Sequence, residues 1–193
     1  MSRLATTASL LLALGLGACG QMPSMASLGL PTETTANLPE DAYSGAADPM
    51  RSAINNTTVA FSGSQLAGRP AAAAKAVAEM EYLQVEVNSN PRSFGGSTTA
   101  STLFPVARRE WRGALGISPG AAPQAVIDGL FGAVRALNAG QPQAAAAALP
   151  ANVFTLGGAA TLQRLAALPP LPNTNQAAQE ASRVLRRGGL GRF

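Results

Sequence analysis

Residues 70–88, PAAAAKAVAEMEYLQVEVN, carry the clearest helical pattern of the chain. Pro70 suits the first turn of a helix, because the N–H that it lacks would be unpaired there in any case. Small, apolar or long side chains then recur every three or four residues, the spacing of one helical face. They are Ala73, Ala76, Val77, Met80, Leu83, Gln84 and Val87. The pattern predicts a helix with one buried face, and three acids mostly fall outside that face: Glu79, Glu81 and Glu86.

Further helices are expected on both sides of this one, because prolines, glycines and capping residues fall where helices begin and end. Asp48 before Pro49 is an N-cap followed by a proline, and Asn173 with Gln176 has the spacing of a capping box. The alternation typical of strands is nearly absent. The expected helices cover about residues 48–62, 98–115, 123–139, 142–149, 159–168 and 173–187. Residues 48–187 are thus predicted to form an all-α domain, a small helical bundle of about five to seven helices.

The segments that flank this domain differ from it in composition. Residues 20–47 contain Pro23, Pro31 and Pro39, with polar residues between them and no sustained periodicity. We expect a flexible tether over residues 19–47, and a coil of that length spans about 30 Å. At the other end, residues 188–193 are expected to form a loose basic tail.

The N-terminal segment has the organisation of a secretory signal. A short polar start with Arg3 leads into an apolar run from Leu10 to Leu14, and small residues follow at 17 and 18. The apolar run is shorter than the ~20 residues that cross a bilayer. The pattern therefore predicts export of the chain and removal of this segment.

The end of that segment, Leu16-Gly17-Ala18-Cys19, resembles the lipobox of bacterial lipoprotein precursors. The resemblance implies cleavage after Ala18, which makes residues 1–18 a lipoprotein signal peptide, and lipidation of Cys19. Two or three acyl chains give lasting attachment, since each buried methylene contributes ~0.8 kcal/mol. The resemblance thus implies an exported lipoprotein, anchored to a membrane by Cys19, and we expect it at the outer membrane, facing the periplasm.

The chain contains no histidine, and Cys19 is its one cysteine. These two facts exclude Ser-His-Asp and Cys-His catalytic arrangements and metal sites built on imidazole. We expect no cofactor, no metal site and no catalytic residue, and we expect a binding or scaffolding module of the cell envelope. Two alternatives stay open: a hydrolase that uses carboxylates or a serine, and a carrier of small apolar ligands.

Two acids of the 70–88 helix are candidates for a catalytic pair. Glu79 and Glu86 lie two turns apart, so their Cα atoms are ~10.5 Å from each other. That spacing exceeds the ~5–9.5 Å between the carboxyl groups of a glycosidase pair. We interpret both as solvated surface charges.

Three arginines surround the only tryptophan of the chain: Arg108, Arg109 and Arg112 lie within one and a half turns around Trp111. They are candidates for binding a phosphate, a carboxylate or an anionic headgroup. In the alternative interpretation Trp111 is a core residue and the arginines pair with Glu110 or with acids on a neighbouring helix. A short loop would lay the 70–88 and 98–115 helices antiparallel, so we favour pairing with the acids of the 70–88 helix.

Charge is distributed unevenly along the chain. The segment from Arg92 to Phe193 contains ten arginines and only three acids, which gives it a net charge of +7. Such a basic region can bind an anionic polymer or an envelope protein. The membrane is a further expected partner, through the lipid on Cys19. Export makes nucleic acid an unexpected partner.

Overall fold

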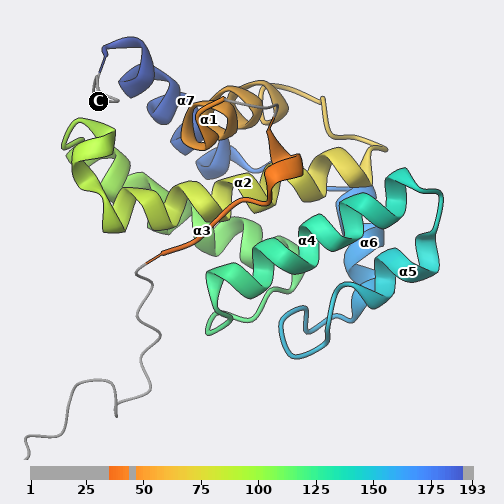
Figure 1. The fold of residues 1–193 in the computed structure, drawn as a ribbon. Coiled ribbons are helices and arrows are strands. Elements are labelled where there is room, and N and C mark those ends of the chain that lie inside the picture. The colour runs from red at the N-terminus through yellow and green to blue at the C-terminus, as the bar shows by residue number, and fades with distance from the viewer. Residues whose placement is uncertain (1–34, 44–46, 189–193) are drawn as a thin grey trace, which may run out of the picture. The chain divides into compact units, whose positions relative to one another are not determined.

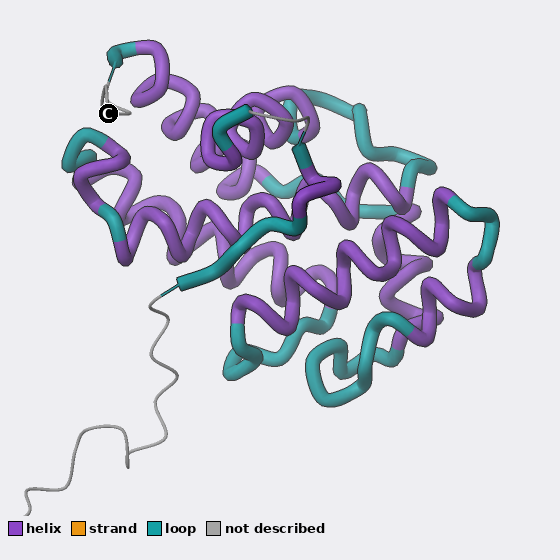
Figure 2. Tube along the Cα trace, in the orientation of Figure 1, coloured by secondary structure: helices purple, strands orange, loops and turns teal. Residues whose placement is uncertain are grey.

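The computed structural model describes residues 35–43 and 47–188, and within them the fold is all α (Figures 1 and 2). No strand forms in these ranges, and Ile117 and Phe154 make an isolated bridge. The helices are α1 (Pro49–Ala60), α2 (Pro70–Ser89), α3 (Thr98–Leu115), α4 (Pro123–Asn138), α5 (Pro142–Ala147), α6 (Gly158–Ala166) and α7 (Pro172–Arg186). The predicted fold class is confirmed, and every expected helix is present.

Helix α2 is the centre of the bundle, and it packs against α1, α3, α4 and α6 (Figure 1). The expectation of one buried face was wrong, because neighbouring helices cover the other faces as well. Glu79 and Glu81 are consequently buried, with 1% and 0% of their surfaces exposed. Small residues such as Ala73, Ala74 and Ala78, all fully buried, allow the neighbours to approach closely. Two carboxylates therefore lie inside the domain.

Helix α3 begins and ends where the sequence predicted, since both ends have local signals. The Ser97 hydroxyl accepts a hydrogen bond from the Ala100 N–H at 3.1 Å, a typical N-cap. Gly116 ends the helix with a φ of +65°, a conformation that glycine adopts without strain. A short turn, η3 (Pro91–Phe94), joins α2 to α3. The two helices pack against each other, so α3 presents one face to α2.

Helix α7 is capped differently from the prediction. The capping box expected at Asn173 and Gln176 was wrong, because Asn173 already lies inside the helix. The carboxylate of Glu110 on α3 accepts hydrogen bonds from the backbone N–H groups of Asn173 and Thr174, at 3.2 and 2.8 Å. A negative charge at a helix N-terminus is favourable for the helix dipole. These bonds outweigh the effect of burial and hold the pKa of Glu110 below its usual value.

Part of the expected tether belongs to the domain. In residues 35–43, Ala36, Leu38 and Ala42 are buried with 4%, 8% and 2% of their surfaces exposed. Asp41 pairs with Arg135 of α4, with 2.6 Å between Oδ2 and Nε. The prediction of a flexible coil was therefore wrong over this stretch, which crosses the helices as an extended segment ending in a short turn (Figure 1). The rest of the expected tether (19–34 and 44–46), the signal segment, Cys19 as the lipidation site and the end of the tail (189–193) lie outside the described residues.

Among the helices of the described ranges, none combines the length and the apolar character needed to cross a bilayer.

Candidate functional site

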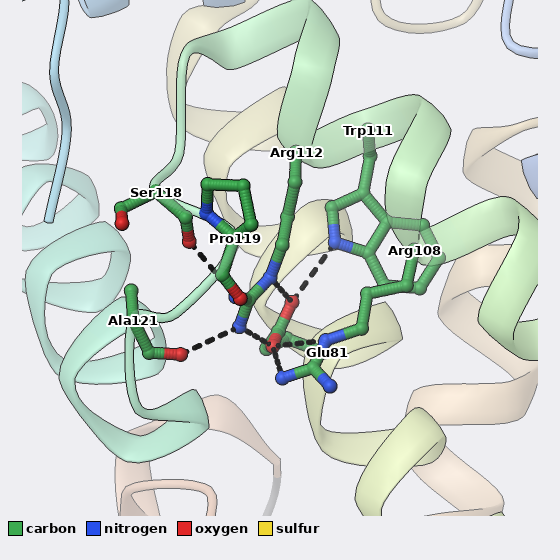
Figure 3. A network of polar contacts seen from close by, with 7 residues as sticks. All are labelled: Glu81, Arg108, Trp111, Arg112, Ser118, Pro119 and Ala121. Atoms are coloured by element: carbon green, nitrogen blue, oxygen red, sulfur yellow. Dashed lines mark hydrogen bonds and ion pairs between the residues drawn. The ribbon is translucent and has the colours of Figure 1, made fainter. Parts of the chain in front are cut away.

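The carboxylate of Glu81 is the centre of a buried polar network between α2 and α3 (Figure 3). Arg108 donates to Oε1 from Nε at 2.9 Å and from Nη2 at 2.7 Å. The Trp111 indole N–H donates to Oε2 at 2.9 Å. Arg112 donates from Nε to Oε2 at 3.2 Å and from Nη2 to Oε1. We call Glu81, Arg108, Trp111 and Arg112 the Glu81 network.

This network bears on the two interpretations of the arginine cluster, ligand binding and pairing with an acid. Arg108 and Arg112 lie one turn apart on α3, on the face that meets α2, and both pair with Glu81. Trp111 is fully buried, as the core interpretation required. For Arg108 and Arg112 the predicted pairing with an acid of the preceding helix is thus confirmed, and Glu81 is the partner.

Arg112 also fixes the loop that follows α3. Its Nη1 donates to the carbonyl oxygens of Ser118 and Pro119, both at 3.0 Å, and its Nη2 donates to that of Ala121 at 3.1 Å (Figure 3). With the bonds to Glu81, all five N–H donors of this guanidinium are occupied. Arg112 therefore supplies positive charge to its surroundings but has no free donor for a ligand.

A cavity of about 440 Å³ adjoins the Glu81 network. All three candidate arginines line it, and Arg109 is the exposed one. Apolar lining comes from Pro105, Ile117 and Pro119. We call this space the arginine cavity. Of the described residues that line it, none is an acid.

Two further features give the arginine cavity its chemistry. Glu81 carries one negative charge against three guanidinium groups, which leaves the region positive. Within the described part of the chain, no acid pairs with Arg109. Gln84 of α2 also lines the cavity and is 1% exposed, and its Oε1 has no hydrogen-bond partner in residues 35–43 and 47–188. A buried acceptor of this kind normally has a donor.

A second cavity, of about 400 Å³, lies between α1 and α2. Glu79 lines it, and we call it the Glu79 cavity. Asn56 donates from Nδ2 to Glu79 Oε1 at 2.9 Å, and Lys75 Nζ lies 3.8 Å from the same oxygen. Glu79 Oε2 is buried and has no hydrogen-bond partner among the residues that the structure describes. The interpretation of Glu79 as a solvated surface charge was wrong, because α1 covers this face of α2.

Burial raises the pKa of Glu79 to about 7 from its ordinary 4.5, although Asn56 and Lys75 favour the ionised form. Between these two pH values the unfolded chain releases the Glu79 proton while the folded protein keeps it. We therefore expect the free energy of unfolding to fall as pH rises from about 4.5 to 7, by roughly 3 kcal/mol, and to level off above that. Urea denaturation at intervals of pH measures this curve.

In Glu79→Gln the free energy of unfolding should change little between pH 4.5 and 7. Glu86→Gln, on the same helix but outside the cavity, should show the same fall as the wild type. No histidine titrates between pH 4.5 and 7, because the chain contains none. Asp41 and Glu110 have lowered pKa values, so their contributions are lost only on acidification below that range. A wild-type curve that is flat between pH 5 and 7 would contradict a buried, protonated Glu79.

Glu79 and Gln84 were not predicted as site residues. Gln84 was correctly expected on the buried face, but nothing in the sequence shows that its amide oxygen lacks a partner. From the sequence, Glu79 cannot be distinguished from an acid on an exposed helix surface, because its burial depends on the packing of α1 against α2. Among the residues that the structure describes, no three Cys, Asp or Glu side chains gather to hold a metal ion.

Comparison with models of protein families, with curated proteins and with solved structures gave no match for this chain.

Proposed function

We propose that this protein is a lipid-anchored binding module of the cell envelope, and that the arginine cavity binds a small organic anion with an apolar body. The observation that carries this proposal is the lining of the cavity. Among the residues that the structure describes, three arginines and no acid line it, and Glu81 offsets only one of the three positive charges.

Different residues of the cavity would contact different parts of the ligand. Arg108 and Arg112 are held in place by Glu81, so their positive field exists before a ligand arrives and little side-chain entropy is lost on binding. Arg109 is exposed and would supply the direct hydrogen bonds to a carboxylate or phosphate. The apolar side chains would contact the body of the ligand. A hydroxyl or N–H on that body would satisfy Gln84 Oε1.

Isothermal titration calorimetry with 6-hydroxyhexanoate tests the proposal, because this probe has a carboxylate, a hydrocarbon chain and a hydroxyl. We expect binding, and we expect 1,6-hexanediol, which lacks the charge, to bind much more weakly. Arg109→Gln should weaken binding of the anion roughly tenfold or more, the usual loss for one hydrogen bond to a charged group.

Arg187→Gln is the matched control, since Arg187 is also an exposed arginine but does not line the cavity. It should bind the anion as the wild type does. Equal binding of the anion and the diol would instead favour a carrier of apolar ligands. Absence of any heat with the anion would contradict the proposal.

The anchor is tested separately at Cys19. The proposal rests here on Leu16-Gly17-Ala18-Cys19 after an apolar run. Cys19→Ser should abolish labelling by a fatty-acid analogue and move the protein out of the membrane fraction, because a hydroxyl does not replace the thiol in the thioether. Labelling that persists in this variant would exclude lipidation at this residue.

A further inference from the structure

The Glu79 cavity holds an incomplete set of polar contacts. Glu79 Oε1 has a donor in Asn56, but Oε2 has none in the described part of the chain. Lys75 Nζ, at 3.8 Å from Oε1, is beyond hydrogen-bonding distance. Buried carboxylates are normally paired or fully hydrogen-bonded. A donor group that enters the cavity would complete the set, and an ammonium group does so most strongly because it is charged.

The charges around the cavity restrict what kind of molecule can bring that donor. Among the described residues, two cations, Arg69 and Lys75, and one acid, Glu79, line the cavity. Asp41 shares an adjoining hollow with Lys75, but it is paired with Arg135. A simple amine would be repelled by the excess positive charge. A simple anion would leave the carboxylate without its donor.

We infer that the Glu79 cavity binds a zwitterionic α-amino acid, with its ammonium group on Glu79 and its carboxylate on Lys75. Glu79 and Lys75 lie one turn apart on α2, with 3.8 Å between Oε1 and Nζ. This distance is similar to that between the ammonium and carboxylate groups of an α-amino acid. This site is separate from the arginine cavity and does not depend on the function proposed for that cavity.

The remaining lining favours a short aliphatic side chain on the amino acid. Val59, Ala60 and Leu66 on one side and Ala72 and Ala76 of α2 on the other contribute apolar surface. A volume of about 400 Å³ falls within the range of small-molecule pockets. A branched aliphatic amino acid such as leucine therefore fits both the charges and the apolar lining.

Calorimetric titration of the full chain with three matched probes at about pH 8 tests the inference. L-Leucine has both charges, 3-methylbutylamine lacks the carboxylate, and 4-methylpentanoate lacks the ammonium group. We expect leucine to bind at least tenfold more tightly than either analogue. Undetectable leucine binding, or an amine that binds as tightly as leucine, would overturn the inference.

Two variants test which residue binds each charge of the amino acid. Glu79→Gln should weaken leucine binding at least tenfold, and Glu86→Gln should leave it unchanged. Lys75→Met should weaken leucine binding but strengthen that of 3-methylbutylamine, because it removes the carboxylate partner and the repulsion of the amine together. A variant that merely disturbed folding would weaken both probes, so this opposite response tests the site even if Glu79→Gln is unstable. Equal weakening of both probes by Lys75→Met would overturn the assignment.

One more measurement separates this site from the arginine cavity. Arg109→Gln should bind leucine as the wild type does, and Glu79→Gln should bind 6-hydroxyhexanoate as the wild type does. If Arg109→Gln weakens leucine binding, leucine occupies the arginine cavity and the inference is wrong.

Discussion

Glu81→Ala is expected to lower the free energy of unfolding by about 3–5 kcal/mol, the loss found when one partner of a buried ion pair is removed. Two guanidinium groups depend on this carboxylate. Arg112 is 4% exposed, and the Arg108 side chain is 15% exposed. Without Glu81 their charges lose their carboxylate partner, and the Trp111 N–H loses its acceptor. Urea denaturation of both proteins at neutral pH measures the difference.

The matched control for this prediction is Glu86→Ala, five residues further along the same helix. Glu86 is only partly buried and accepts a hydrogen bond from Asn90 at its own helix end, so its removal should change stability by about 0.5 kcal/mol or less. A small loss in Glu81→Ala as well would mean that the two arginines reach water, which contradicts the buried network.

A double-mutant cycle gives an independent check on the same pairing. Arg112→Met alone leaves Glu81 with less positive charge, whereas Arg112→Met in a Glu81→Leu protein removes a guanidinium that has already lost its carboxylate. The second substitution should therefore cost clearly less than the first, by an amount in the usual range of about 0.5–3 kcal/mol for contacting residues. Additive effects would mean that the two side chains do not share a network.

The fold was predictable because helix ends have local signals. Pro49, Pro70, Pro123 and Pro142 each begin a helix, and Gly116 ends one. Such signals act within one turn, so a single sequence contains them. The Glu110 cap of α7 could not be predicted in this way, because it comes from a residue more than 60 positions away in the chain.

Burial around α2 was harder to predict than the helix itself. An apolar face at helical spacing shows that one side is covered, but it does not show whether small residues on the other sides meet neighbours or water. Alanine occurs in both environments. Once α1 and α3 pack on α2, Glu79 and Glu81 enter the interior, and the site chemistry depends on these two acids. Only the tertiary arrangement assigns them different partners.

The segment 35–43 was missed for a related reason. It is extended before its short turn, so its buried residues have no helical spacing, and its prolines and polar residues resemble those of a linker. Its contacts are with distant residues: Asn37 bonds with Gln124, at 2.8 Å, and Asp41 with Arg135. Neither partner can be identified from the local sequence.

Trp111→Ala should destabilise the domain by about 3–5 kcal/mol, the range for truncation of a large buried aromatic side chain. The indole is fully buried, and it lies on the face of α3 that meets α2. Alanine would remove its packing contacts and leave a space that the surrounding helices fill only in part. The substitution also removes the N–H that binds Glu81. Thermal melts and urea denaturation followed by circular dichroism measure the loss, since the variant has no tryptophan.

Trp111→Phe separates the two parts of that loss. Phenylalanine retains much of the buried ring but has no N–H, so Glu81 Oε2 keeps Arg112 as its donor and loses the indole. The expected cost is about 1.5–3 kcal/mol, that of one hydrogen bond to a charged group, and clearly less than for alanine. If both variants lose about the same stability, the hydrogen bond matters more than the packing. If Trp111→Ala remains as stable as the wild type, the packing between α2 and α3 is not what holds the centre of this domain together.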